Sequence, residues 1–227
     1  GKTFRWTGRY HENMNHRETL DVSIDVLEKF APRLTAEAAE APVALLANMS
    51  PDNQLAVIRQ LTGNPFVIVD SMDLWINIAR EGLMEVMKHA DLFVINEDEA
   101  MLFTESSGNV AAGKKLLGMG PRHVVVKKGE HGALLFGPDG QFFTTPAYPL
   151  EGVSDPTGAG DTFAGGLAGH LATLGRRPEF ADIIQGVVRG SVLASFTCEA
   201  FGVKRLAALT PAALEERLTA FRKCTAW

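Results

Sequence analysis

The stretch SDPTGAGDTFAGG, residues 154–166, places aspartates and glycines where a helix is predicted to begin. A helix N-terminus offers unpaired backbone N–H groups and a partial positive charge. Glycine lets such a backbone approach a phosphate closely, so we expect the backbone of Gly158, Ala159 and Gly160 to form an anion hole. Asp161, in the first helical turn, could take a proton from a hydroxyl during phosphoryl transfer. The alternative is a tight glycine turn in which Asp161 is only a favourable charge at a helix start.

Two further segments place polar groups at the ends of apolar runs. VINEDEA carries Asn96 and Glu99, and an amide with a carboxylate suits a water-rich Mg²⁺ site. Taken alone, Asn96 would equally be a helix cap followed by an acidic first turn. VVVKKGEHGALLF carries Lys127, Gly129 and Gly132. Lys127 could contact a phosphate, and Gly129 allows the backbone close to a nucleotide, but an ordinary turn with solvated lysines remains the alternative.

The segments around these residues alternate between predicted strands and predicted helices. Short apolar runs alternate with helical stripes from residue 42 to residue 127, a pattern typical of a parallel sheet covered on both faces. The predicted strands are PVALLAN, FVIVD, LFVIN and HVVVK, and the predicted helices are SPDNQLAVIRQL, LWINIAREGLMEVMKHA, EDEAMLF and residues 109–118. GALLFGPDGQFFTTPAY then predicts a hairpin, and TFAGGLAGHLATL, residues 179–198 and TPAALEERLTAF predict three helices.

The first thirty residues are patterned differently. KTFRWTGRY alternates like a strand with one covered face, residues 11–20 are polar and loop-like, and DVSIDVLEKF has the spacing of a short helix. No internal repeat and no long linker divides the chain. We therefore expect a single domain over residues 1–227, with residues 1–20 as a strand and loop appended to it.

Composition excludes several classes of protein. The 227 residues carry a formal charge of −5, which does not favour a nucleic-acid backbone or an anionic membrane as a partner. The sequence contains no run of about 18 apolar residues, so no membrane span is predicted. Cys198 and Cys224 have no metal-ligand spacing and imply no disulfide scaffold, so a reducing cytoplasm is the expected location.

The glycine-rich stretch resembles a family signature. DPTGAGDTFAGG is similar to the second signature of the PfkB, or ribokinase-like, carbohydrate kinases, with Pro156 where a threonine is common. VINEDEA is similar to the family's Asn-x-x-Glu motif, and VVVKKGEHGALLF to the strand-turn-strand that lies along ATP. The resemblance implies a ribokinase-like three-layer α/β/α sandwich with a mostly parallel central sheet and a small β lid. It places ATP beside Asn96, Lys127, Gly129 and Gly132, and Mg²⁺ at Asn96 and Glu99.

The resemblance also implies roles for individual residues. Asp161 would be the catalytic base, and the Gly158–Gly160 backbone would be the anion hole. Asp155 would lie near the substrate or near a monovalent cation such as K⁺. Ser191 and the backbone at Gly202 would border the adenine. The Phe201-Gly202 loop would contribute to the cation site, although the following Val-Lys-Arg departs from the small residues usual there.

Family members usually carry more chain before the point that matches residue 1 here. In the resemblance, residues 1–20 correspond to part of the lid, and Asn13, Asn15 and Arg17 would lie near the substrate mouth, with a solvated loop as the alternative. A chain of these residues alone is expected to have a half-formed sugar pocket and an exposed sheet edge. The aromatic residues of the lid strand also suggest a homodimer through the lid.

The expected function is ATP-dependent transfer of the γ-phosphoryl group to a hydroxyl of a sugar or sugar-like molecule. A nucleoside kinase of the same fold stays open as an alternative, and so does a protein that only binds nucleotide or sugar. A P-loop at Gly1-Lys2-Thr3 is rejected because a strand pattern, not a helix, follows it. A dinucleotide-binding Rossmann fold is rejected because GAGDTFAGG does not match GxGxxG and lies late in the chain.

Overall fold

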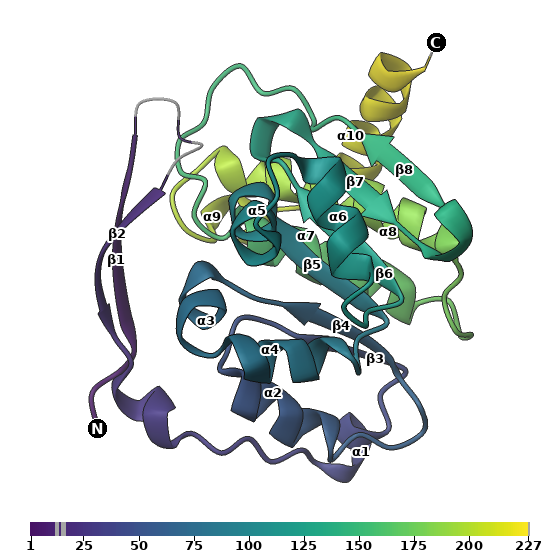
Figure 1. The fold of residues 1–227 in the computed structure, drawn as a ribbon. Helices are drawn as coiled ribbons and strands as arrows, with labels where there is room; N and C mark the ends of the chain where they lie inside the picture. The colour runs from purple at the N-terminus through teal and green to yellow at the C-terminus, as the bar shows by residue number, and fades with distance from the viewer. Residues whose placement is uncertain (12–13, 15–16, 227) are drawn as a thin grey trace.

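The computed structural model describes residues 1–11, 14 and 17–226. Its centre is a six-stranded sheet with the strand order β3-β4-β5-β6-β7-β8 (Figure 1). The first four strands run parallel and the last two are antiparallel. Their bounds are β3 (Val43–Leu46), β4 (Phe66–Asp70), β5 (Leu92–Asn96), β6 (His123–Lys127), β7 (Ala133–Phe136) and β8 (Phe142–Thr145). The four strands and the hairpin predicted from the sequence are confirmed.

Helices cover both faces of this sheet, which confirms the three-layer α/β/α architecture (Figure 1). Successive strand residues point to opposite faces, so Val69 and Ile95 pack in one core while Ile68 and Val94 pack in the other. One layer holds α2 (Pro51–Ile58), α4 (Arg80–Met87), α5 (Glu97–Thr104) and α6 (Asn109–Leu117); the other holds α7 (Ala159–Ala172) and α8 (Phe180–Cys198). The remaining α-helices are α1 (Ala36–Ala39), α3 (Asp73–Ile78), α9 (Lys204–Ala207) and α10 (Pro211–Thr225), and α10 packs on α8 through a small third core. Among the described residues, no helix is both long and apolar enough to cross a membrane.

Helices α7 and α8 pack closely because glycine removes side chains from their contact. A Cβ added to Gly190 would lie 2.5 Å from the carbonyl oxygen of Phe163, and one added to Gly166 would lie 2.5 Å from Leu193. Only a residue without a side chain fits this separation. The close contact fixes the end of α8 against the beginning of α7, where the glycine-rich turn lies.

The lid is a separate two-stranded antiparallel sheet along one side of the domain (Figure 1). Strand β1 (Arg5–Tyr10) pairs with β2 (Arg17–Ser23), and the 3₁₀ helix η1 (Asp25–Lys29) follows. The loop predicted over residues 11–20 is therefore wrong at residues 17–20, and the helix predicted over residues 21–30 is wrong at residues 21–23, where β2 continues; residues 25–29 form only a short 3₁₀ helix. The ladder to β1 overrides the short helical spacing, and the ion pair from Arg5 to Asp21, at 2.9 Å, crosses the two strands. Asn13 and Asn15, predicted near the substrate mouth, lie outside the described residues, while Arg17 begins β2.

The single helix predicted for LWINIAREGLMEVMKHA is also wrong, because the chain breaks it into α3 (Asp73–Ile78) and α4. Ala79 joins the two at φ −141° and ψ 36°, outside the helical region. Arg80 donates to the carbonyl of Phe103 at 2.5 Å and stacks 4.6 Å from the centre of its ring. This tertiary contact with α5 outweighs the local helical spacing.

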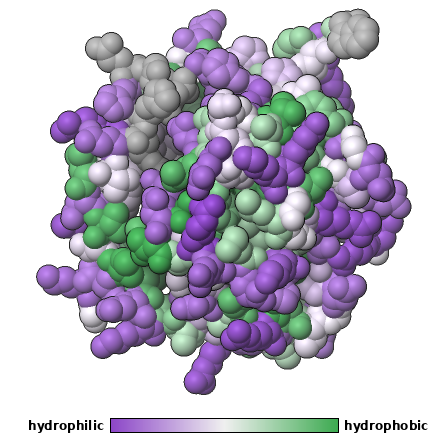
Figure 2. All heavy atoms as spheres, viewed as in Figure 1, coloured by the Kyte–Doolittle hydropathy of each residue, from purple (hydrophilic) through white to green (hydrophobic). Residues whose placement is uncertain are grey.

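Exposed apolar side chains are frequent in the N-terminal part of the chain. Phe4, Leu20, Val26, Leu27 and Phe30 are all exposed. Figure 2 shows hydrophobic residues among hydrophilic ones on the side where Figure 1 places the lid strands. The homodimer through the lid nevertheless stays a prediction.

Candidate active site

Three neighbouring parallel strands end in polar residues at one edge of the sheet. Asp70 ends β4, Asn96 ends β5 and Lys127 ends β6. The register pairs Asn96 directly with Lys127. Lys127 Nζ lies 3.3 Å from Asp70 Oδ1, and the two side chains are only 17% and 7% exposed. The carboxyl edge of the sheet, where ligands bind in open α/β folds, thus carries a buried ion pair.

Asp70 was not predicted as a site residue, although its signal is in the sequence. It is the acidic residue that ends the otherwise apolar run FVIVD. Burial raises the pKa of Asp70, the charge and hydrogen bond of Lys127 oppose that rise, and the charge of Asp161 adds to it. The influence of Asp161 shows that the carboxylate of the glycine-rich stretch lies near the end of β4.

The glycine-rich turn meets Lys127 at the beginning of α7. Gly158 precedes the helix with φ +82°, a conformation that favours glycine. The N–H of Ala159 is engaged, because it donates to the carbonyl of Pro156 at 3.1 Å. Gly160 lies so near Lys127 that an added Cβ would be 3.2 Å from Nζ. Within the described part of the chain, no residue accepts a hydrogen bond from the N–H of Gly160.

The charges and the N–H of Gly160 at this turn favour an anion. A helix N-terminus and an ammonium group converge on Gly160, and both favour negative charge. Asp161 follows in the first turn of α7, and its side chain is exposed, so a hydroxyl can reach it. The structure therefore places Lys127 beside the turn that carries Gly158, Gly160 and Asp161, and the catalytic and anion-binding roles of these residues stay predictions.

Helix α8 supports the turn through a threonine that sequence reasoning missed. Thr197 Oγ1 donates to Thr162 Oγ1 at 2.8 Å, and a Cβ added to Gly158 would lie 3.9 Å from Thr197 Cγ2. Nothing in the local sequence marks Thr197, because the contact joins residues from two helices. Ser191 is buried six residues earlier, about 9 Å along the helix axis. Its assignment to the adenine site stays a prediction.

Asp155 is joined to the Gly202 loop. Its Oδ1 accepts from the N–H of Thr157 at 2.9 Å, which closes an Asx turn. Burial raises the pKa of Asp155, but hydrogen bonds from Thr157 and from the backbone of Gly202 outweigh it and hold the pKa below its usual value. Gly202 itself has φ +65°. The site thus pairs Asp155 with Gly202, and a monovalent cation there stays a prediction.

Asn96 and Glu99 form a reciprocal cap at the start of α5. Asn96 Oδ1 accepts from the N–H of Glu99 at 2.9 Å, and Glu99 Oε2 accepts from the N–H of Asn96 at 3.2 Å. In the described residues, no group of three or more His, Cys, Asp or Glu side chains could hold a metal. A closed protein cage is therefore not built here. One carboxylate and one amide fit Mg²⁺, which keeps several waters and takes phosphate oxygens as further ligands.

The turn between β6 and β7 depends on its glycines. Gly129 and Gly132 have φ +52° and +86°. A Cβ at Gly132 would lie 2.0 Å from the carbonyl oxygen of Thr145, so the end of β8 leaves no room for a side chain. The role of Gly132 shown here is therefore to close this turn. Contact of either glycine with a nucleotide stays a prediction.

The lid reaches the glycine-rich turn through one hydrogen bond. Thr157 Oγ1 donates to the hydroxyl of Tyr10 at 3.2 Å, joining residues 147 positions apart. Strand β1 thus ends beside the turn that carries Asp161.

Solved structures of other proteins share this fold. The ribokinase of Giardia lamblia superposes with a TM-score of 0.79 at 18% identity, covering 96% of this chain and 72% of its own. A ribokinase II candidate of E. coli, solved in complex with ATP and Mg²⁺, has a TM-score of 0.60 at 19% identity, covering 76% and 58%. The sheet, its two helical layers and the lid thus define a ribokinase-like fold.

The sequence places the chain more closely. Residues 16–208 match the profile of the pfkB family carbohydrate kinases, and the chain belongs to this family. The cytidine kinase of Thermococcus kodakarensis is 32% identical over 176 residues, which cover 75% of this chain and 62% of that protein. The chain therefore spans less than two thirds of this relative. The resemblance inferred from the three motifs is confirmed.

Proposed function

We propose that this protein transfers the γ-phosphoryl group of ATP to a hydroxyl of a sugar or nucleoside. The observation that carries the proposal is the meeting of Lys127 Nζ with the backbone of Gly160, one residue before Asp161. A base and an anion site within one helical turn match what phosphoryl transfer to a hydroxyl requires.

In the proposed reaction, each of the residues at this site has one role. Asp161 accepts the proton of the acceptor hydroxyl, the hydroxyl oxygen forms a bond to the γ-phosphorus, and the bond from that phosphorus to the ADP oxygen breaks. The N–H of Gly160 and the ammonium of Lys127 stabilise the negative charge of the transferred group. Asp70 holds Lys127 in place through the 3.3 Å ion pair.

Asn96 and Glu99 would hold Mg²⁺ at the same edge of the sheet. The register pairs Asn96 with Lys127, so the two residues lie side by side on neighbouring strands. When bound, Mg²⁺ neutralises phosphate charge. The capping hydrogen bonds between Asn96 and Glu99 fix both side chains before any ligand binds.

A nucleoside acceptor is favoured by one specific observation. The curated relative that covers 75% of this chain at 32% identity is a cytidine kinase. We therefore place nucleosides beside sugars in the acceptor class, with cytidine as the first nucleoside to test.

ADP release from Mg·ATP, measured over a panel of pentoses, hexoses and nucleosides, tests the proposal. ADP release that depends on one acceptor supports the kinase and chooses between sugar and nucleoside. Binding of Mg·ATP without ADP release for any acceptor in the panel would contradict the proposal and favour a protein that only binds.

A further inference from the structure

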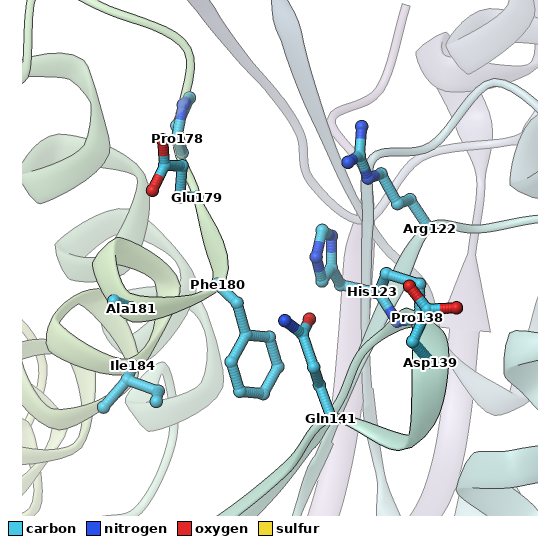
Figure 3. Close-up of a pocket in the computed structure, with 10 residues that line it drawn as sticks. All are labelled: Arg122, His123, Pro138, Asp139, Gln141, Pro178, Glu179, Phe180, Ala181 and Ile184. Carbon is cyan, nitrogen blue, oxygen red and sulfur yellow. The ribbon is translucent and has the colours of Figure 1, made fainter.

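A second concavity lies at the end of β6 opposite Lys127. It is a pocket of about 510 Å³, a size that suits a small molecule. Three separate segments line it: the start of β6, the β7–β8 turn and the start of α8 (Figure 3). Strand β6 has five residues, so its two ends are about 13 Å apart. The pocket is therefore distinct from the candidate active site.

The unusual group in this pocket is His123. The residue is only 4% exposed, and Nδ1 lies 3.0 Å from the carbonyl oxygen of Asp91. A carbonyl can only accept, so Nδ1 carries the proton. Burial lowers the pKa of His123, which keeps the ring neutral near pH 7. Nε2 is then a hydrogen-bond acceptor, and among the described residues none donates to it.

Flat and polar groups surround this acceptor. The rings of His123 and Phe180 stack with centroids 6.1 Å apart and an interplanar angle of 28°. Figure 3 shows His123, Phe180 and Gln141 reaching toward one another from the three segments. The amide of Gln141 adds a donor beside the acceptor of His123.

The charge of the pocket limits what can bind. Arg122 contributes one positive charge, whereas Asp139 and Glu179 contribute two negative charges. With His123 neutral, the lining has a net negative charge, which disfavours an anion such as a phosphate or a carboxylate. Because no described residue donates to His123 Nε2, an N–H of a ligand can bond to it in place of water.

We propose that this pocket binds a small, flat, uncharged amide, either an aromatic carboxamide or a ring lactam. The amide N–H donates to His123 Nε2, the amide carbonyl accepts from the side chain of Gln141, and the ring packs against Phe180. The site is independent of the phosphoryl-transfer chemistry.

The test is a titration of the whole chain with nicotinamide, followed by ligand-observed NMR, with saturating Mg·ATP present. Nicotinate is the matched probe, because it keeps the ring but lacks the N–H and carries a negative charge. We expect saturable binding of nicotinamide and at least about tenfold weaker binding of nicotinate. His123→Phe, which keeps a flat ring, and Gln141→Leu should each weaken nicotinamide binding about 3- to 10-fold, the scale of one hydrogen bond. His170→Phe, on α7, should leave it unchanged.

Several results would overturn the proposal. They are no saturable binding of nicotinamide, displacement of nicotinamide by Mg·ATP, equal affinity for nicotinate, or unchanged affinity in both pocket variants. His123 is buried, so His123→Phe must first show the far-ultraviolet circular dichroism of the parent. Gln141 is exposed, and Gln141→Leu decides alone if His123→Phe does not fold.

Discussion

Replacing Lys127 with methionine should destabilise the protein without any substrate present. Methionine keeps the length and apolar part of the side chain but removes the ammonium that lies 3.3 Å from Asp70 Oδ1. At that distance the gross attraction is about 5 kcal/mol for an effective dielectric constant of about 20. Both side chains are largely buried, so water screens the pair little.

The net loss is smaller than the gross attraction, because the pair also costs desolvation. Removing one partner leaves Asp70 buried without its cation, and such losses are about 3–5 kcal/mol for a fully buried pair. Lys127 keeps some exposure, so we expect a fall of about 2–4 kcal/mol in the free energy of unfolding near pH 8. In a chain of this size the corresponding fall in Tm is roughly 5–15 °C.

The loss of stability in Lys127→Met should depend on pH. Burial already raises the pKa of Asp70, and removing Lys127 raises it further. Because folding raises the pKa of this carboxyl, the folded state holds the proton up to a higher pH than the unfolded state does. The stabilisation that this proton contributes is fully present below the unfolded pKa of about 3.9. Stability then falls as the pH rises toward the folded pKa. Lys127→Met should therefore lose less stability, relative to the parent, at pH 5 than at pH 8.

Urea unfolding at both pH values checks this prediction. The double variant Lys127→Met with Asp70→Asn buries neither charge, and should recover most of the stability that the single variant loses at pH 8. A single variant as stable as the parent, or a double variant as unstable as the single one at both pH values, would refute the ion-pair reasoning.

Two further predictions concern the turn and the cap. Gly132→Ala should cost more than about 2 kcal/mol, because its Cβ would meet the carbonyl of Thr145 at 2.0 Å. Gly140→Ala has a similar φ of +78° but open space, and should cost only about 1–2 kcal/mol in the same urea experiment. Asn96→Ala should cost about 1 kcal/mol as a lost cap and raise the Mg²⁺ concentration for half-maximal activity. Ser50→Ala removes the cap of α2 and should match the stability loss alone; equal Mg²⁺ dependence in both variants would remove Asn96 from the metal site.

Most of the sheet and the glycine-rich turn could be predicted because their patterns are local. The strand that ends at Asn96 is a continuous apolar run, and the turn at Gly158 has a positive φ that favours glycine. Both features can be recognised from neighbouring residues alone. The errors occur where contacts between distant parts of the chain determine the structure. Residues 17–23 are too polar and mixed to show a strand until β1 pairs with them, and the break at Ala79 depends on a contact between Arg80 and α5.

Some site residues could likewise be predicted from local motifs, and others could not. Asp161 and Lys127 lie within recognisable motifs, whereas Asp70 and Thr197 act through partners distant in the chain. Asp70 could have been proposed from its place at the end of an apolar strand, since charged residues there face the ligand edge of a parallel sheet. Thr197 could not, because its contact depends on how closely α7 and α8 pack.

The rate of phosphoryl transfer by Asp161→Asn tests whether Asp161 is the base. Asparagine keeps the shape of the side chain and removes the base, so we expect turnover to fall by about 10²- to 10⁴-fold. Asp52→Asn is the matched control, because Asp52 occupies the first turn of α2 as Asp161 does in α7, and turnover should stay at the parent level. Turnover in Asp161→Asn equal to that of the parent would contradict the proposed role of Asp161 and with it the account of this site.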